Sequence, residues 1–422
     1  MYKYKKPAVW HYDCSLCYTT PMEKTFTAVA LCAVGAEKAV SNEIKKLASK
    51  GSALKVDDSL YGRVRFTTDI CGLYQALIGL RAADRVLLEA GQFKAMDFDA
   101  LFEGASCVEW EQLVPKGMGL KVAKVRVNRS QLKAETTIQS MVHKAAAQRL
   151  CEKYKMNRLP EPAVNTHVKV AEVRVYIEKD FVSLLLDLSG DPLFKRGYRS
   201  EGGAAPLRET TAASILLLSG WKRKFPLYDP FCGSGTILIE AAMYAWDMAP
   251  GLGRHFAIED MLIADTQIEH RVRDEFRAKI DFTRLVRIAG SDDDLRTISI
   301  AQSNAARLRD IAEGRDPQHG IRSKNDAPGI ELKAVPMKEA ASPFADAGFI
   351  LTNPPYGKRL GDQNAAEEIY KEMAGLSSRF PGWKIAVITD HSGFESFFGK
   401  KADFCKEISN GAIPSYFYEY NV

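Results

Sequence analysis

The sequence predicts an α/β fold, with a doubly wound, seven-stranded sheet in the C-terminal half and two smaller α+β modules before it. From about Ala205 onward, short apolar segments alternate with amphipathic segments, as in parallel strands joined by crossover helices. Before that point, strand and helix patterns follow each other with few residues per element. The length of 422 residues also exceeds that of one ordinary domain.

The composition is that of a globular protein with sizeable cores, because 46% of the residues are apolar and 26% are charged. No run of eighteen uncharged apolar residues occurs, and basic residues near the start precede no apolar stretch. We therefore expect no membrane span, no signal peptide and a cytoplasmic location. Residues 1–21 show no periodicity, so we expect them to be a disordered extension. Their Cys14-x-x-Cys17 has no second pair, so no metal site is expected.

The first module is expected over residues 22–95. "FTAVALCAV" is typical of a strand, and "GAEKAVSNEIKKLASKG" is typical of a helix that ends at Gly51. "YGRVRFTTD" alternates as a strand does, and "ICGLYQALIGLRAADRVLLEAGQF" indicates a helix followed by a strand.

The second module is expected over residues 96–187. "LKVAKVRV" alternates apolar and basic residues, which indicates a strand with one basic, solvent-facing side. "TIQSMVHKAAAQRLCEKY" predicts an amphipathic helix, and two further strands flank the turn at Lys179-Asp180. A connector rich in Gly and Pro follows this module.

Positive charge is concentrated in the second module, although the whole chain carries a formal charge of only +5. Between Lys116 and Arg158 there are eleven Lys or Arg residues and two Glu residues. Such a local excess indicates a polyanionic partner, with a solvated charged face as the alternative.

The C-terminal half, residues 188–422, is expected to hold five parallel strands. Their segments are "FPLYDP", "LVRIAG", "IELKAV", "FILTNPP" and "KIAVITD". The chain then closes as a hairpin on an Asn410-Gly411 turn. In such a sheet, ligands bind outside the carboxyl ends of the strands.

Two of these strand ends carry residues suited to a nucleoside with a positive charge. The first ends in "YDPFCGSGT", whose glycines allow a sharp turn and close approach to a ligand. Asp229 in this turn would repel a phosphate, and Asp292 stands where acids bind ribose hydroxyls. A ribose with a cationic group describes S-adenosylmethionine better than a dinucleotide. The alternative is a tight turn with capping aspartates.

The fourth strand ends in "NPPY", from Asn353 to Tyr356. Pro354 and Pro355 have a fixed φ and donate no hydrogen bond, so they hold the loop rigidly. The Asn353 side chain and the Pro354 carbonyl then offer two acceptors for the two N–H bonds of an amine, and Tyr356 offers a face for base stacking. Methyl transfer to such an amine depends on positioning and charge stabilisation. A structural Asn-Pro turn is the alternative.

In combination and in order, these motifs resemble those of bacterial THUMP-domain class I RNA methyltransferases, similar to the 23S rRNA guanine-N2 methyltransferases. "LFKRGYR", "APLRETTAASILLLSGW", "YDPFCGSGTILIEAA", "AGSDDD", "LTNPPYGKRLG" and "NGAIPSYFYEY" carry the resemblance, which covers about residues 22–422. It implies a ferredoxin-like piece over 22–95, a THUMP RNA-binding domain over 96–187 and a Rossmann-like catalytic domain over 188–422. The segment 1–21 has no counterpart.

The resemblance implies roles for individual residues. The catalytic loop would be Asn353, Pro354, Pro355 and Tyr356. The cofactor residues would be Thr210, Asp229, Pro230, Cys232, Gly233, Ser234, Gly235 and Asp292. The basic residues expected to contact RNA phosphates are Lys121, Lys124, Arg126, Arg129 and Lys144. Relatives commonly have an acid for adenine after the third strand, whereas this chain has Val335-Pro336-Met337, so we expect backbone and Met337 contacts there.

The expected activity is S-adenosylmethionine-dependent methylation of a guanosine N2 amine in 23S rRNA, with no obligate protein partner. The alternatives are guanine-N2 methylation of tRNA, adenine-N6 methylation of DNA, methylation of a protein glutamine and a non-catalytic RNA-binding protein. The basic second module disfavours the protein substrate, and the complete NPPY and DPFCGSGT motifs disfavour a non-catalytic protein.

Overall fold

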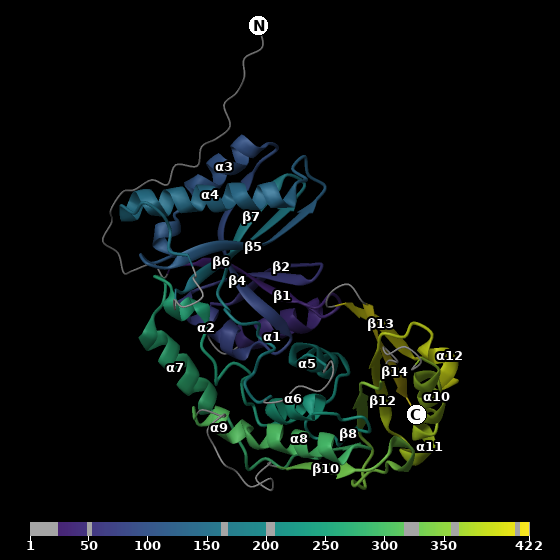
Figure 1. Ribbon diagram of the computed structural model, residues 1–422. Coiled ribbons are helices and arrows are strands. Elements are labelled where there is room, and N and C mark those ends of the chain that lie inside the picture. The colour runs from purple at the N-terminus through teal and green to yellow at the C-terminus, as the bar shows by residue number, and fades with distance from the viewer. Residues whose placement is uncertain are drawn as a thin grey trace.

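The computed structural model describes residues 24–48, 53–161, 168–199, 207–315, 329–355, 363–409 and 414–421. Two sheets of seven strands dominate it, one in each half of the chain (Figure 1). The expected extension 1–21 and the expected Asn410-Gly411 turn lie outside the described residues. Within the ranges given, no helix is both long and apolar enough to cross a membrane.

The first sheet has the strand order β2-β3-β1-β4-β7-β6-β5. Its strands are β1 (Phe26–Cys32), β2 (Lys55–Leu60), β3 (Arg63–Thr68), β4 (Ala83–Lys94), β5 (Gly119–Asn128), β6 (Val170–Glu178) and β7 (Phe181–Asp187). The long strand β4 pairs with β1 on one side and with β7 on the other. One continuous sheet therefore runs through both N-terminal regions.

Helices cover one face of this sheet, and they are α1 (Glu37–Ala48), α2 (Ile70–Gly79), α3 (Phe98–Cys107) and α4 (Glu135–Tyr154). The buried residues of neighbouring strands lie in register on that face, because Ala28 pairs with Leu88, and Leu88 with Leu186. Side chains alternate along a strand, so the opposite face carries a separate small cluster of Val29, Leu87 and Leu185. We refer to this second side as the open face.

The second sheet has the order β10-β9-β8-β11-β12-β14-β13. Its strands are β8 (Leu227–Asp229), β9 (Ile288–Asp292), β10 (Ile330–Ala334), β11 (Phe349–Thr352), β12 (Lys384–Thr389), β13 (Phe404–Ser409) and β14 (Pro414–Asn421). The first five are parallel, and β14 is antiparallel to β12 and β13. The predicted fold class is therefore confirmed, including the antiparallel pair at the end.

Helices on both sides of this sheet complete the C-terminal half. They are α5 (Glu209–Leu218), α6 (Thr236–Ala245), α7 (Thr266–Arg277), α8 (Leu295–Ala306), α9 (Leu308–Ala312), α10 (Gln363–Met373), α11 (Leu376–Arg379) and α12 (Phe394–Phe398). The chain moves outward from β8 through β9 to β10, and then returns to place β11 on the other side of β8. This reversal creates a crevice at the carboxyl ends of β8 and β11, the usual ligand position in such sheets.

The elements that were not predicted include strand β2 and helices α3 and α7, and each of these three has a polar sequence signal. Strand β2, "KVDDSL", lies at the edge of the sheet and is mostly exposed, so it needs no apolar face. Helices α3 and α7 are capped at their N-termini by Asp97 and Asp265, whose carboxylates accept the backbone N–H groups of Ala100 and Ile268.

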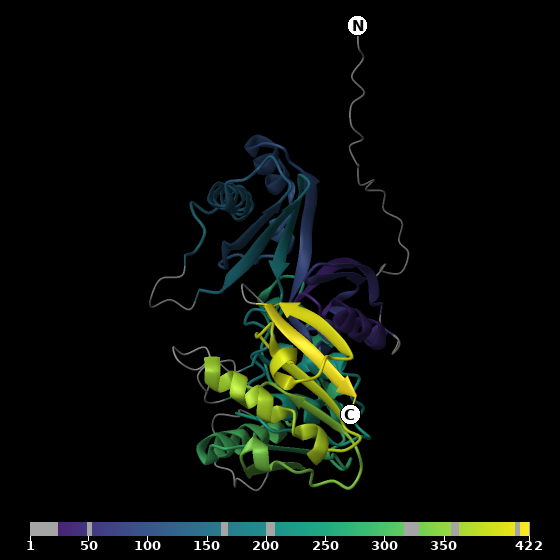
Figure 2. The same cartoon turned by 90° about the vertical axis from the view of Figure 1, so that its right-hand side faces the viewer.

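The two halves are joined by buried contacts. The Arg196 guanidinium is 1% exposed, pairs with Glu240 at 3.3 Å and also donates to the Arg81 carbonyl of the first half. Arg81 in turn donates to the Met248 carbonyl of the second half at 2.6 Å. Figure 2 shows β13 and β14 reaching the lower edge of the first sheet, where Ser409 forms a β-bridge with Val34.

Candidate active site

A cavity of about 410 Å³ lies at the carboxyl ends of β8, β9 and β11, in the crevice expected from the strand order. It brings together predicted residues from three separate segments, namely Asp229, Pro230, Cys232, Gly233, Ser234, Asp292, Asn353 and Pro355. Lining residues that were not predicted for this site are Leu207, Phe231, Thr236, Ile237, Asp293, Thr297, Ile300 and Ile369.

The turn after β8 is shaped by two glycines. Gly233 and Gly235 have φ values of +52° and +83°, in the region that residues with a side chain rarely adopt. The Gly235 N–H donates to the Cys232 carbonyl at 2.8 Å, and Gly235 caps the N-terminus of α6. A Cβ at position 235 would also lie 3.2 Å from the Ala301 Cβ. The turn therefore places Cys232, Gly233 and Ser234, and Thr236 at the start of α6, in the lining of the cavity.

Asp229 is a buried acid at the base of this turn, with 1% of its surface exposed. Its Oδ1 accepts the Thr352 hydroxyl at 2.6 Å and the Phe231 N–H at 3.0 Å. Burial outweighs these bonds and, with a smaller contribution from Asp292, raises the pKa of Asp229 to about 7. Both bonds go to Oδ1, so Oδ2 is available to a cationic or hydrogen-bonding ligand.

Asp292 ends β9 and faces the same cavity. Its Oδ2 accepts the Gly233 N–H at 3.0 Å, and its Oδ1 accepts the Asp294 N–H at 3.2 Å. Partial burial, followed by repulsion from Asp293 and Asp294, raises the pKa of Asp292. A carboxylate can accept about four hydrogen bonds, so Asp292 retains capacity for ligand hydroxyls.

Asn353 follows β11 directly and supplies an unused acceptor. Its Oδ1 is buried and has no hydrogen-bond partner among the described residues. Two residues further on, the Pro355 carbonyl accepts a hydrogen bond of 3.0 Å from the Tyr370 hydroxyl, which anchors the loop to α10. Because an unpaired buried acceptor is costly, a ligand N–H is the natural partner for Asn353.

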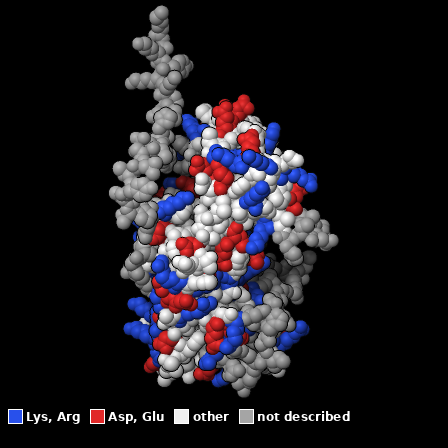
Figure 3. All heavy atoms as spheres, turned by 90° about the vertical axis from the view of Figure 1, so that its left-hand side faces the viewer, with Lys and Arg blue, Asp and Glu red and all other residues white. Residues whose placement is uncertain are grey.

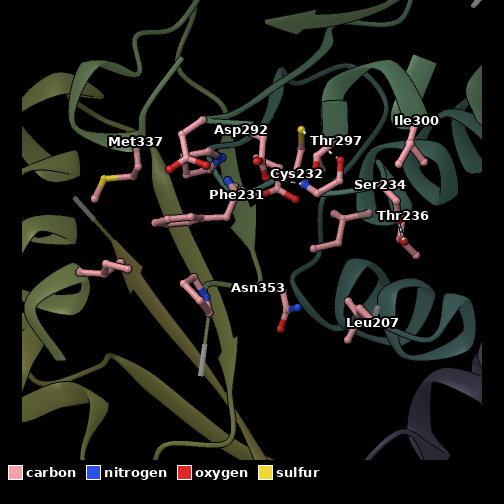
Figure 4. A pocket seen from close by; sticks show the side chains of 17 residues that line it. Leu207, Phe231, Cys232, Ser234, Thr236, Asp292, Thr297, Ile300, Met337 and Asn353 are labelled. Carbon is pink, nitrogen blue, oxygen red and sulfur yellow. Dashed lines mark hydrogen bonds between the residues drawn. The ribbon is translucent and has the colours of Figure 1, made fainter. Parts of the chain in front are cut away.

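Figure 4 shows how the lining side chains are distributed around the cavity. Met337 and Phe231 lie on one side, Thr236 and Ile300 on the other, and Asn353 lies across the cavity from Asp292. Met337 is 7% exposed and directly follows the Val335-Pro336 pair. The cavity therefore combines apolar side chains with acids and the Asn353 amide.

Several predicted residues lie elsewhere. The Thr210 hydroxyl is hydrogen-bonded to Asp84 and does not line the cavity. Gly235 and Pro354 belong to the same loops as the lining residues but are not themselves in the lining. Tyr356 lies outside the described residues.

The five basic residues expected to contact RNA are distributed over different surfaces. Lys124 and Arg126 line a groove of about 810 Å³ on the open face of the first sheet. Lys121 forms an ion pair with Glu172 at 2.8 Å, and the Lys144 ammonium lies 5.8 Å from the centre of the Phe102 ring. Arg129 has a left-handed φ of 51° in the loop after β5.

Comparison with known proteins gives a consistent result for both halves. Residues 196–418 match the RMKL-like methyltransferase domain, and residues 27–87 match the RlmL ferredoxin-like domain. The chain is 34% identical over 403 residues to the Bacillus subtilis protein named "Putative RNA methyltransferase YpsC", a match that covers 94% of this chain and 96% of that protein.

Two solved structures share the whole architecture. One is a possible methylase from Clostridium difficile 630, with a TM-score of 0.81 and 34% identity, covering 94% of this chain and 98% of the other. The second is SMU.472, solved in complex with SAH, with a TM-score of 0.79 and 33% identity. This match covers 95% of this chain and 99% of SMU.472.

Proposed function

The chain belongs to the RMKL-like methyltransferase family, and from this premise we propose that it methylates the N2 amine of a guanosine in 23S rRNA. The methyl donor is S-adenosylmethionine. The expected catalytic loop is Asn353, Pro354, Pro355 and Tyr356, and the RNA is held by the N-terminal half, in which residues 96–187 form a THUMP domain.

The cavity supports this choice of cofactor. It offers acids at Asp229 and Asp292 for the amino acid and ribose parts, and apolar side chains at Met337 and Phe231 for a flat base. SMU.472, which shares 33% of its sequence with this chain, was solved with SAH, the compound that remains when S-adenosylmethionine has lost its methyl group. A sulfonium donor needs no strong base when the acceptor is positioned well.

The single observation that carries the proposed chemistry is the unpaired Oδ1 of Asn353. An exocyclic amine is a poor nucleophile while its lone pair is delocalised into the base. The Asn353 amide oxygen can accept a hydrogen bond from one N–H of the base amine and so hold the amine in place. It also stabilises the positive charge that develops on the amine nitrogen as the methyl group is transferred. Tyr370 supports this role by fixing the Pro355 carbonyl of the same loop.

RNA as the substrate is supported by the name of the relative YpsC and by the basic residues of the second module. The expected phosphate contacts are Lys121, Lys124, Arg126, Arg129 and Lys144. Guanosine N2 in 23S rRNA is the target that the motif set favours, with tRNA as the second choice.

The test is nucleoside mass spectrometry of separated rRNA and tRNA from a strain that lacks this gene. Loss of N2-methylguanosine from 23S rRNA, restored by the wild-type gene and not by an Asn353→Ala variant, supports the proposal. Loss from tRNA alone would move the substrate to tRNA. Loss of N6-methyladenine from DNA, with rRNA and tRNA unchanged, would overturn it.

A further inference from the structure

A large groove outside the cavity lies on the open face of the first sheet. It has a volume of about 810 Å³ and is lined by strands from both N-terminal regions and by the connector to the C-terminal half. Its cationic lining residues are Arg63, Arg85, Lys124, Arg126, Arg174 and Arg208, against three acids, Asp84, Glu135 and Glu178. We refer to this feature as the sheet groove.

Much of the positive charge in the sheet groove is not neutralised by the protein. In the described part of the chain, Arg63, Lys124, Arg126 and Arg208 form no ion pair, whereas Arg85 and Arg174 share Asp187. Burial and the proximity of Arg126 and Arg174 lower the pKa of Lys124, as expected where like charges gather. Such a concentration of uncompensated cations favours a polyanionic ligand. By contrast, basic and acidic side chains are interspersed over the face in Figure 3.

Aromatic rings are interleaved with these cations. The Arg63 guanidinium lies 5.2 Å from the centre of the Tyr176 ring, and that of Arg208 lies 5.1 Å from the centre of the Phe194 ring. Tyr61 at the rim is 80% exposed. Flat rings and guanidinium planes stack on unpaired bases, whereas a duplex hides the faces of its bases.

The position of the sheet groove connects it to the active site. Arg208 lines the groove, and its neighbour Leu207 lines the cavity that contains Asn353. The hydrogen bond between Thr210 and Asp84 joins the start of α5 to the lining of the groove. The linings of the groove and the cavity therefore adjoin at residues 207 and 208.

We propose that the sheet groove binds a single-stranded segment of the RNA substrate and directs it toward the cavity. This inference rests on the proposed function for its choice of RNA. It assigns the strand to the open face of the sheet, where Lys124 and Arg126 lie, with Arg63, Arg208 and Tyr61 as further contacts.

The experiment measures binding of a fluorescent 15-nucleotide single-stranded RNA, and of a duplex of the same sequence, by anisotropy from 50 to 200 mM salt. Wild-type protein should prefer the single strand. The double variant Arg63→Gln, Arg208→Gln should bind it at least tenfold more weakly, and the slope of log K against log salt should fall by about 1.4, or about 0.7 for each lost phosphate contact. Tyr61→Ala should weaken binding about tenfold without changing the slope.

The matched control is Lys38→Gln, Lys45→Gln, which removes two charges from exposed lysines of α1 on the covered face. This control should change affinity less than twofold. S-adenosylmethionine binding by calorimetry should be unchanged in every variant, which excludes general misfolding.

Three outcomes contradict the inference in different ways. If the double variant of Arg63 and Arg208 binds RNA as wild-type protein does, the sheet groove is not the RNA-binding site, and the proposed function stands. Equal affinity for duplex and single strand overturns the choice of a single strand. If wild-type protein binds neither RNA form but does bind S-adenosylmethionine, RNA itself is the wrong substrate.

Discussion

Thr352 donates a hydrogen bond of 2.6 Å to Asp229, although 123 residues separate them in the chain. Thr352 is the last residue of β11 and directly precedes Asn353, while Asp229 is the last residue of β8. The bond therefore links the acid proposed for the cofactor to the loop proposed for the base amine. Both residues are fully buried or nearly so, at 0% and 1% exposed.

Replacing Thr352 with Val should impair both binding and chemistry. Valine has nearly the same shape as threonine, but it cannot donate a hydrogen bond to Asp229. Loss of a buried hydrogen bond to an ionisable group should lower the free energy of unfolding by about 1–2 kcal/mol. S-adenosylmethionine should bind about tenfold more weakly by calorimetry, and turnover should also fall. Thr352→Ser keeps the hydroxyl and should retain most of both. Equal loss in the Ser variant would indicate that packing of the methyl group matters and the bond does not.

Cofactor binding should depend on pH through Asp229, whose pKa is raised to about 7 by burial. If the cationic cofactor requires the ionised carboxylate, its affinity should rise about tenfold per pH unit between pH 5.5 and 7 and should level off above 7. Calorimetry across this range measures the profile. An Asp229→Asn variant should bind the cofactor weakly and without this pH dependence. If the affinity of the wild-type protein does not change with pH, Asp229 does not take part in cofactor binding.

The same substitution should stabilise the protein in the absence of cofactor. Between pH 4 and 7 folded Asp229 keeps a proton that the unfolded chain releases, so the wild-type free energy of unfolding falls as pH rises through this range. Asparagine can still accept from Thr352 and Phe231 but carries no charge to bury. Asp229→Asn should therefore match wild type near pH 4 and exceed it above pH 7, by at most about 4 kcal/mol at 1.36 kcal/mol per pKa unit. Urea unfolding at both pH values tests this, and a difference that does not change with pH would contradict it.

The sequence predicted the second sheet and most of the cavity because their signals are local. Alternating apolar segments mark the strands, and the carboxyl ends of parallel strands meet at one edge, which is how Asp229, Asp292 and Asn353 come together. Thr352 and Tyr370 were not predicted as functional because their partners are distant in the chain. Thr352 did carry a weak signal, as a polar residue that ends a buried apolar strand. The sheet groove depends on β4, which pairs with β1 on one side and β7 on the other and so places β3 in the same sheet as β5 and β6. The pattern of each single strand does not specify this pairing.

Asn353→Ala should lower turnover sharply while S-adenosylmethionine still binds within about threefold of wild-type affinity. The side chain offers an acceptor to the substrate, and its Oδ1 bonds no described residue of the protein, so little structure depends on it. Loss of such an acceptor typically costs about 10²–10³ in rate. Asn353→Asp keeps an oxygen acceptor and should retain more activity than the alanine variant. Single-turnover rates together with calorimetry distinguish this role from a structural one, in which both values would fall together.

Tyr370→Phe should slow the reaction only because the loop that contains Asn353 and Pro355 is held less firmly in place. Its hydroxyl lies 3.0 Å from the Pro355 carbonyl and 3.2 Å from the Thr389 hydroxyl, so the loop would lose its anchor to α10. Turnover should fall about tenfold with cofactor affinity unchanged, and stability should fall by about 1 kcal/mol for one hydrogen bond. The matched control is Tyr154→Phe, which removes a 2.7 Å bond to the Val114 carbonyl in the other half of the chain. That control should lose similar stability but keep its turnover; an equal loss of turnover in both variants would mean that lowered stability, rather than loop position, limits the rate.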